Sequence, residues 1–220
     1  MKKLAVGLML VGFQFSFAQI SRKVGEFSSL KVYDKITVTI IPSTENRVES
    51  DSDDASLETV NKNGELKIRM APVKTLQGDQ VTVKVYYQNI NDIQASQGSV
   101  VGSSETLKAR MLTLTSNEGS KINLDVDTGK LNIKTNSGGE ITVKGNADNQ
   151  DIVVTSGGKF NGQNLDSQSA TVSTTAGGVA DVFASESVDA KTRAGGIINI
   201  YGDPEERQYK NVIGGKINFK

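Results

Sequence analysis

Apolar and polar residues alternate along most of the chain, with the two-residue period of a β-strand that buries one face. In residues 91–220, glycine-containing turns separate these alternating segments at a nearly constant interval of about 19 residues. The turns lie at Gly98-Ser99, Gly119-Ser120, Gly138-Gly139, Gly157-Gly158, Gly177-Gly178, Gly195-Gly196 and Gly214-Gly215. The pattern predicts a repeating unit of strand, glycine turn, strand and loop.

Two columns of mostly apolar residues emerge on the strand that follows each turn. The first column contains Val101, Ile122, Ile141, Phe160, Ala180, Ile198 and Ile217. The second contains Ser103, Leu124, Val143, Gly162, Val182, Ile200 and Phe219. One repeat cannot bury its own apolar residues, whereas stacked repeats bury them continuously. We therefore predict an all-β fold, a right-handed parallel β-helix or solenoid with rungs of about 19 residues, rather than a meander or sandwich.

The glycine pairs fit this geometry for two reasons. A turn that reverses the chain within two or three residues needs a positive φ, which glycine reaches without steric cost. Glycine also leaves room for the neighbouring rung, which lies ~4.8 Å away.

A polar column runs between the two apolar columns and, by alternation, faces outward. It contains Asn123, Thr142, Asn161, Asp181, Asn199 and Asn218. Stacked amide side chains can hydrogen-bond along a parallel ladder and stiffen that face. The same row of amides and hydroxyls could instead serve as a recognition surface, and both interpretations remain open.

Residues 19–90 are predicted to form an irregular β region that caps the N-terminal end of a solenoid formed by residues 91–220. We expect residues 19–220 to fold as one unit. Strands are expected at 27–32, 36–41, 66–70 and 81–87, with a hairpin turn at Asn63-Gly64. Residues 42–54 predict a polar loop and 55–60 one helical turn. At the other end, Phe219 leaves the last rung poorly covered, which predicts docking or self-association through that rung.

The first 18 residues have the pattern of an export signal. Lys2 and Lys3 precede an apolar run at 4–15, and Ser16-Phe17-Ala18 is a small-x-small cleavage site. The run is short for a membrane anchor, and no later segment is apolar enough to span a bilayer. We expect the mature chain to be exported to the periplasm, the cell surface or the extracellular space.

Composition narrows the range of chemistry. The 25 basic and 25 acidic residues balance, and the basic ones are scattered, so no nucleic-acid partner is expected. The sequence contains no His, Cys or Trp. It therefore lacks the commonest general base and metal ligand as well as any thiolate, and no cofactor is expected.

Two acidic clusters are the only candidates for catalysis or metal binding. Asp51, Asp53 and Asp54 lack the glycine and ligand spacing of a calcium loop. Asp125 and Asp127 point outward from one strand, where carboxylates could bind Ca²⁺ or act as acid and base. Solvated surface residues are the favoured interpretation of both clusters.

The motif Gly-(Gly/Ser)-x-(Ile/Phe)-Asn recurs, for example at Gly119–Asn123 and, with its last four positions, at Gly215–Asn218. Together with the opening Phe27–Val32 and the late Gly-Asp-Pro at 202–204, it resembles the auto-transporter adhesin "head GIN" domain family. The resemblance covers roughly residues 24–220. It implies a β-helix-like fold and an adhesive or cell-surface role, and it brings no catalytic residues.

Three hypotheses for function follow. The leading one is a non-enzymatic secreted or cell-envelope protein, an adhesin-like β-solenoid that binds an unknown surface glycan or envelope protein. The second is a carbohydrate-active β-helix enzyme that uses carboxylates alone. The third is a periplasmic scaffold or sensor module that docks through the open C-terminal rung.

Overall fold

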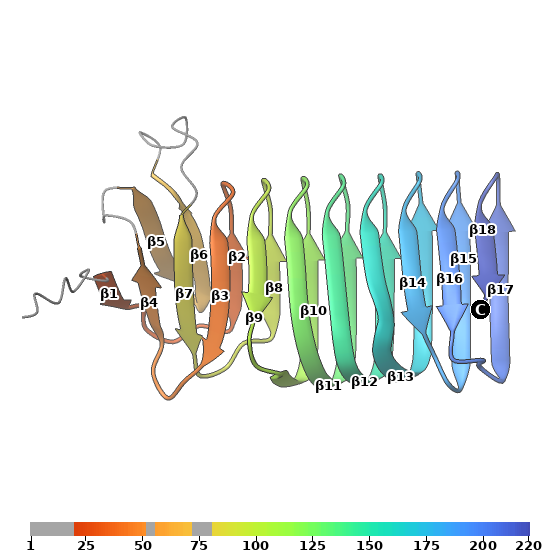
Figure 1. Ribbon diagram of the computed structural model, residues 1–220, viewed down its shortest axis with the longest axis horizontal. Helices are drawn as coiled ribbons and strands as arrows, with labels where there is room; N and C mark the ends of the chain where they lie inside the picture. The colour runs from red at the N-terminus through yellow and green to blue at the C-terminus, as the bar shows by residue number, and fades with distance from the viewer. Residues whose placement is uncertain (1–19, 52–55, 72–80) are drawn as a thin grey trace, which may run out of the picture.

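The computed structural model describes residues 20–51, 56–71 and 81–220, so the expected signal sequence at 1–18 lies outside the described residues. Within this part of the chain every regular element is a strand. Eighteen strands form one continuous sheet that winds into a right-handed solenoid (Figure 1). The all-β solenoid predicted from the repeat is confirmed.

The strands fall into a group before the repeats and a group within them. The first group is β1 (Ile20–Lys23), β2 (Ser29–Val32), β3 (Thr37–Pro42), β4 (Arg47–Ser50), β5 (Leu57–Lys62), β6 (Glu65–Met70) and β7 (Thr82–Tyr87). The second group is β8 (Asp92–Ala95), β9 (Val100–Ser103), β10 (Leu107–Ser116), β11 (Lys121–Thr135), β12 (Glu140–Val154), β13 (Lys159–Thr175), β14 (Val179–Phe183), β15 (Ser187–Arg193), β16 (Ile197–Tyr201), β17 (Glu206–Val212) and β18 (Lys216–Phe219).

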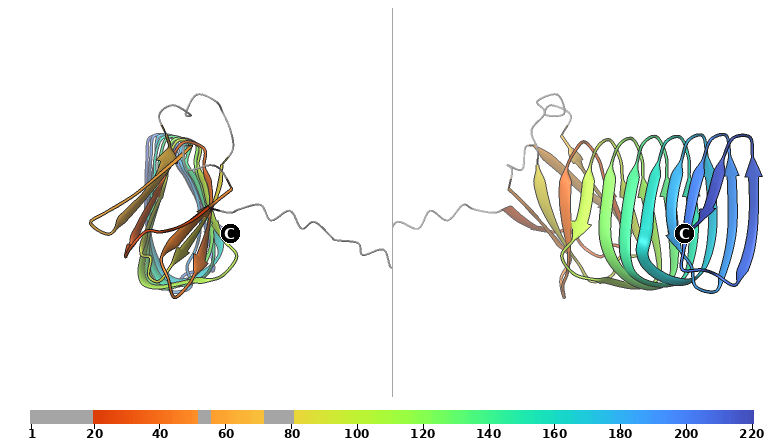
Figure 2. Two further views of the ribbon diagram at one scale, coloured as in Figure 1. Left: turned by 90° about the vertical axis from the view of Figure 1, so that its left-hand side faces the viewer. Right: turned by 45° about the vertical axis from the view of Figure 1, so that its right-hand side comes forward.

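From the β8–β9 rung onward, each rung has one strand that leads into a glycine turn and one strand that leaves it, and these turns line the upper edge in Figure 1. In the β2–β3 rung, Asp34 and Lys35 supply the positive φ values at this place. The strands that lead into the glycine turns, and the strands that continue their parallel pairing, form what we call the upstream face: β2, β6, β8, β15, β17 and the C-terminal parts of β10 to β13. The strands that leave the glycine turns, and those that continue their pairing, form the downstream face: β3, β7, β9, β14, β16, β18 and the N-terminal parts of β11 to β13. The end-on view in Figure 2 shows a flattened cross-section with these faces along its long sides.

Neighbouring rungs pair in parallel and follow the predicted first apolar column. Ile122 lies opposite Val101 of the preceding rung and Ile141 of the following one. The column continues in register as far as Ile217. Its members up to Ile198 are buried, so this column forms a continuous core along the solenoid.

The second apolar column has one irregularity, because one rung is longer by a residue. Thr142 lies opposite Asn161, whereas Lys144 lies opposite Asn164, so β13 bulges between these pairs. A Cβ atom on Gly162, within the bulge, would lie 2.6 Å from the ring of Phe160. The buried Phe160 ring therefore fills space that aliphatic side chains of this column fill in other rungs.

The two glycines of a pair have different roles. In the turn from Asn136 to Gly139, the Gly139 N–H donates to the Asn136 carbonyl at 2.8 Å. The central residues Ser137 and Gly138 have φ values of 49° and 74°, as in a type I′ turn. Gly138 faces open space, whereas a Cβ atom on Gly139 would overlap the Ser116 carbonyl of the preceding rung. The first glycine thus supplies the turn conformation, and the second allows the rungs to stack.

The N-terminal strands add two rungs in an order that differs from the sequence. The β2–β3 rung lies between the β6–β7 rung and the β8–β9 rung, with parallel pairing on both sides. Beyond β6 and β7, strands β1, β4 and β5 add antiparallel pairings. Val48 and Leu57 of these strands are buried in the core, so an irregular β cap covers the N-terminal end. The domain boundary at residue 90 stays a prediction.

Two local expectations in this region are wrong. The segment expected to be a polar loop contains β4, which pairs antiparallel with β7. The segment expected to hold a helical turn contains β5, which pairs antiparallel with β6 through the predicted Asn63-Gly64 hairpin turn. Both sequences become strands because the edges of the β6–β7 rung offer unpaired backbone groups, and this outweighs weak local preference.

Substitution of the two glycines of one turn should separate their roles. We expect Gly138→Ala to lower the free energy of unfolding by about 1 kcal/mol, the cost of a left-handed alanine. Gly139→Ala should lower it by about 3 kcal/mol, because the new methyl group forces the neighbouring rung to shift. Urea titration followed by far-ultraviolet circular dichroism measures both values.

The pair Gly157→Ala and Gly158→Ala, one rung further along, repeats the comparison. Gly157 also faces open space, whereas a Cβ atom on Gly158 would lie 2.5 Å from the Thr135 hydroxyl. Equal losses for the two members of each pair would contradict the division of roles.

Candidate functional site

The predicted polar column lies on the downstream face and is in register throughout. Its members pair with one another from rung to rung along the sequence-predicted series Asn123, Thr142, Asn161, Asp181, Asn199 and Asn218. All six are at least partly exposed. The structure therefore brings these residues together as one outward row, and their role in binding stays a prediction.

Hydrogen bonds divide this row into two parts. The Asn199 amide nitrogen donates to the Asp181 carboxylate at 2.6 Å. The Asn218 amide nitrogen donates in turn to the Asn199 side-chain oxygen at 2.8 Å. Among the described residues, Asn123 and Asn161 form no side-chain hydrogen bond. The C-terminal part of the row thus ties rungs together, while the other part keeps its polar groups available.

The upstream face carries a second polar column that sequence analysis missed. It is also in register from rung to rung, and it contains Asp92, Thr113, Asn132, Asp151, Thr171, Asp189 and Gln208. The signal was present in the sequence at the same interval of about 19 residues. Alignment of the polar positions on the strands before the turns reveals it.

A shallow depression of about 420 Å³ lies over this second column. It extends over several rungs near the C-terminal end of the upstream face. Apart from the buried Gln150, its polar lining residues, which we call the upstream groove, are Lys130, Asn149, Asp151, Ser169, Thr171, Ser187, Asp189, Glu206 and Gln208. Carboxylates, amides and hydroxyls alternate here, so the groove can accept and donate hydrogen bonds along its length.

Two carboxylates of the upstream groove are held in ion pairs. The Lys130 ammonium lies 2.7 Å from the Asp151 carboxylate, and the Lys191 ammonium lies 2.9 Å from that of Asp189. The hydroxyl of Ser187 donates to that of Ser169 at 2.9 Å. These contacts fix the side chains, and they leave exposed groups such as Asn149 and Thr171 between them without side-chain hydrogen bonds in the described chain.

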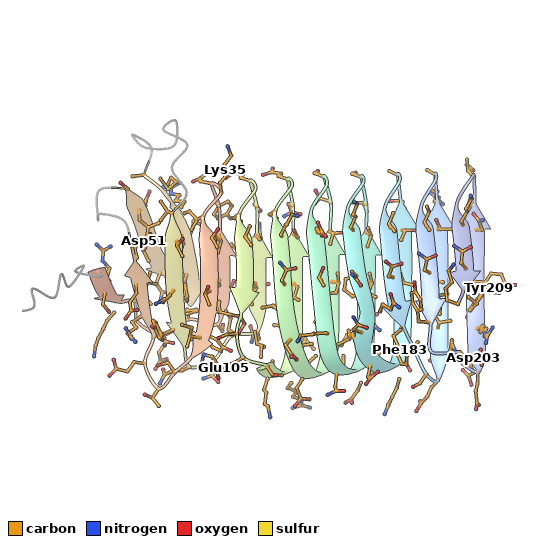
Figure 3. The ribbon with its side chains drawn as sticks, viewed as in Figure 1. Lys35, Asp51, Glu105, Phe183, Asp203 and Tyr209 are labelled. Carbon is orange, nitrogen blue, oxygen red and sulfur yellow. The ribbon has the colours of Figure 1, made fainter. Side chains whose placement is uncertain are left out.

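A further hollow of about 400 Å³ lies at the edge opposite the glycine turns. Phe183 lies beside it, near the lower edge of the solenoid in Figure 3. Asp148 and Asp166 are among its lining residues. This hollow combines one aromatic ring with carboxylates, but it spans fewer rungs than the upstream groove.

The described members of the two acidic clusters form hydrogen bonds or ion pairs with neighbouring strands. Asp51 accepts a hydrogen bond from the Thr82 backbone N–H at 3.1 Å, while Asp53 and Asp54 lie outside the described residues. The Asp125 carboxylate lies 3.4 Å from the Lys144 ammonium, and that of Asp127 lies 3.8 Å from the ammonium of Lys108. Among the residues that the structure describes, no three His, Cys, Asp or Glu side chains form a group that could hold a metal ion.

Electrostatic contacts at the N-terminal end tie its rungs and hairpin together. The Lys31 ammonium lies 2.6 Å from the Glu65 carboxylate on the adjacent rung. This hydrogen bond lowers the pKa of Glu65 and raises the pKa of Lys31. Across the β5–β6 hairpin, the Arg69 guanidinium lowers the pKa of Glu58 in the same way. These pairs strengthen contacts within the cap and lie away from the upstream groove.

The fold and its outward polar columns define a class of protein, the right-handed β-solenoid with polar outer faces. Residues 26–204 match the family described as "Putative auto-transporter adhesin, head GIN domain". The chain belongs to this family. No curated protein matches the chain.

Solved structures share the fold over nearly the whole chain. A crystal structure of a putative adhesin from Bacteroides fragilis has a TM-score of 0.84 and 21% identity, covering 95% of this chain and 100% of that one. One from Parabacteroides merdae, also described as a putative adhesin, has a TM-score of 0.73 and 15% identity, covering 92% and 95%. A putative lipid binding protein from Parabacteroides distasonis has a TM-score of 0.70 and 18% identity, covering 92% and 96%.

The family is adhesin-like by its description, which suggests an exported or surface location. In the part of the chain described here, no helix has the length and apolar character needed to cross a bilayer.

Because hydrogen bonds divide the polar column of the downstream face, two matched substitutions in it should change the free energy of unfolding by different amounts. Asn199→Ala should lower the free energy of unfolding by about 1 to 2 kcal/mol, because it removes two hydrogen bonds between rungs. Asn123→Ala, at the equivalent position of an earlier rung, should change it by less than about 0.5 kcal/mol. Urea titration of the two variants provides the measurement, and a larger loss for Asn123→Ala would contradict the assignment.

Proposed function

We propose that this chain is a non-enzymatic, surface-binding module, an adhesin that holds its ligand on the upstream groove. One observation carries the proposal: the groove places polar side chains on several successive rungs of a rigid scaffold. Family membership supports an adhesive role. A site made by stacked rungs is straight and repetitive, which fits an extended ligand better than a compact one.

The lining favours a glycan as the ligand. Sugar hydroxyls both donate and accept hydrogen bonds, and the groove presents carboxylates that accept, with amides and hydroxyls that do both. Asn149 and Thr171 are exposed within the groove and carry polar groups for such contacts. Successive rungs lie ~4.8 Å apart, so equivalent contacts recur along the groove. An envelope protein is the alternative occupant.

The carboxylates support binding better than catalysis. A glycosidase of the common type needs one carboxyl group kept protonated by an apolar environment beside a second carboxylate. In the groove, Asp151 and Asp189 are each paired with a lysine. They belong to rungs separated by the rung of Thr171. Asp125 and Asp127 are likewise paired with lysines on the surface.

The export pattern at residues 1–18 supports placement of the module outside the cytoplasm. Periplasm, cell surface and extracellular space all fit the proposal. A role as a periplasmic scaffold or sensor would use the same exposed faces for a protein ligand. It would then give protein capture from envelope material without glycan binding.

A glycan array tests the proposal most directly. We expect the purified chain to bind extended polysaccharides and Asn149→Ala/Thr171→Ala to lose at least about tenfold in affinity, since each lost hydrogen bond contributes about 1 kcal/mol. A matched control is Asn161→Ala/Thr142→Ala, which removes the same side-chain types from the downstream face. It should retain binding.

An equal loss of glycan affinity in both double variants would contradict the assignment of the binding site to the groove. If the chain binds no glycan but captures an envelope protein, the ligand is a protein and not a glycan. Reproducible cleavage of a glycan, abolished by Asp125→Asn or Asp127→Asn, would overturn the non-enzymatic assignment.

A further inference from the structure

The last rung differs from the others in the residues that face the solenoid axis. On the upstream face, Arg207 and Tyr209 occupy the positions of Val188 and Ala190 in the rung before. These large polar or amphipathic side chains replace small apolar ones at the end of the core. Tyr209 is 64% exposed, and Figure 3 shows it at the C-terminal end of the solenoid.

These residues form an ordered aromatic and cationic cluster with Phe219. The Arg207 guanidinium lies 4.6 Å from the centre of the Phe219 ring, and the Tyr209 ring meets that ring edge-on at 5.7 Å. The Arg207 guanidinium also donates to the Pro204 carbonyl at 2.8 Å. Tyrosine and arginine are the residue types that dominate binding energy at protein interfaces.

Strand β17 also presents an open hydrogen-bonding edge. Among the described residues its sheet partner is β15. The Glu206 N–H donates to the Glu186 carbonyl at 3.0 Å, and the Val212 carbonyl accepts from the Ala194 N–H at 3.2 Å. The backbone N–H and C=O groups of the even-numbered residues of β17 thus point toward β15. The direction of these groups alternates from one residue to the next along a strand. The backbone N–H and C=O groups of Arg207 and Tyr209 therefore point toward the open edge.

The sequence of β17 is complementary to itself when read in reverse. In an antiparallel pairing centred on Gln208, Glu206 meets Lys210 of a second copy, and Arg207 meets Tyr209 of that copy. Both contacts occur twice, so two ion pairs form on the outer face and two cation–π contacts on the axial side. This register also places Arg207 and Tyr209, whose backbone groups are free, in the hydrogen-bonded positions.

The other end of the solenoid ends in antiparallel strands rather than in a rung of the repeat. There β4 and β5 pair with β7 and β6, and the antiparallel cap covers the first rungs. Head-to-tail stacking into a filament is therefore disfavoured. A contact between two C-terminal ends closes after two copies.

We propose that two copies of this chain join end to end through antiparallel pairing of β17 with β17, in the register centred on Gln208. The dimer extends the upstream face across the junction and brings the two upstream grooves into one line, since Glu206 and Gln208 belong to both the groove and the junction. The pairing itself does not depend on the identity of the glycan or other ligand.

Charge reversal tests both the partner and the register. Sedimentation velocity over a hundredfold range of protein concentration should show the purified chain as a dimer. Glu206→Lys or Lys210→Glu alone should weaken dimerisation at least about tenfold, because each places like charges opposite one another twice. The double variant Glu206→Lys/Lys210→Glu should restore the dimer, because it re-forms both ion pairs with reversed polarity.

Tyr209→Ala should also weaken the dimer, and circular dichroism should show the native spectrum in every variant. A matched control is Lys134→Glu, an exposed lysine of the upstream face on β11, several rungs from the junction, which should leave the dimer unchanged. A monomer at all concentrations, a species larger than a dimer, or failure of the double variant to restore what the single variants lose would overturn the proposal.

Discussion

The close approach of successive rungs at the glycine turns is the constraint on which this solenoid depends. Parallel backbone hydrogen bonds require strands ~4.8 Å apart. At the turn this spacing leaves no room for a Cβ atom at Gly139. The turns also bond to one another, as where the Gly138 N–H donates to the Ser156 carbonyl at 3.2 Å. Once the turns are stacked in register, the buried columns and the outward polar columns follow from alternation alone.

This dependence explains how much of the structure the sequence could predict. Parallel in-register stacking converts a fixed interval in sequence into a neighbour in space, so the partners of Ile122 and the members of the downstream row could be named. The strands β4 and β5 could not, because they form only against edges made elsewhere. The polar column of the downstream face is divided by the side-chain hydrogen bonds of Asn199, and the spacing of residues in the sequence does not specify such bonds. The groove was missed because it lies on polar positions before the turns.

The proposed functions use different physical properties of one scaffold. The faces of the solenoid have satisfied backbones, so only side chains such as Asn149 and Thr171 are available for a ligand there. The C-terminal end has the opposite character, because β17 offers backbone groups together with Arg207 and Tyr209. Side-chain contacts on a flat face suit an extended polar ligand, whereas an open edge specifies orientation and register. Binding and assembly can therefore occur together.

The interleaving of the first rungs has a consequence for how the chain acquires its structure. β2 and β3 are made first, yet both their edges stay unpaired until β6 to β9 have been synthesised on either side of them. β2 and β3 therefore cannot act as a stable template for the strands that follow. The N-terminal region can complete its strand pairing only after residues up to about 103 have been synthesised. Later rungs can then add one at a time. In evolution, the same arrangement lets the array lengthen by duplication among β11 to β13 while its beginning stays fixed.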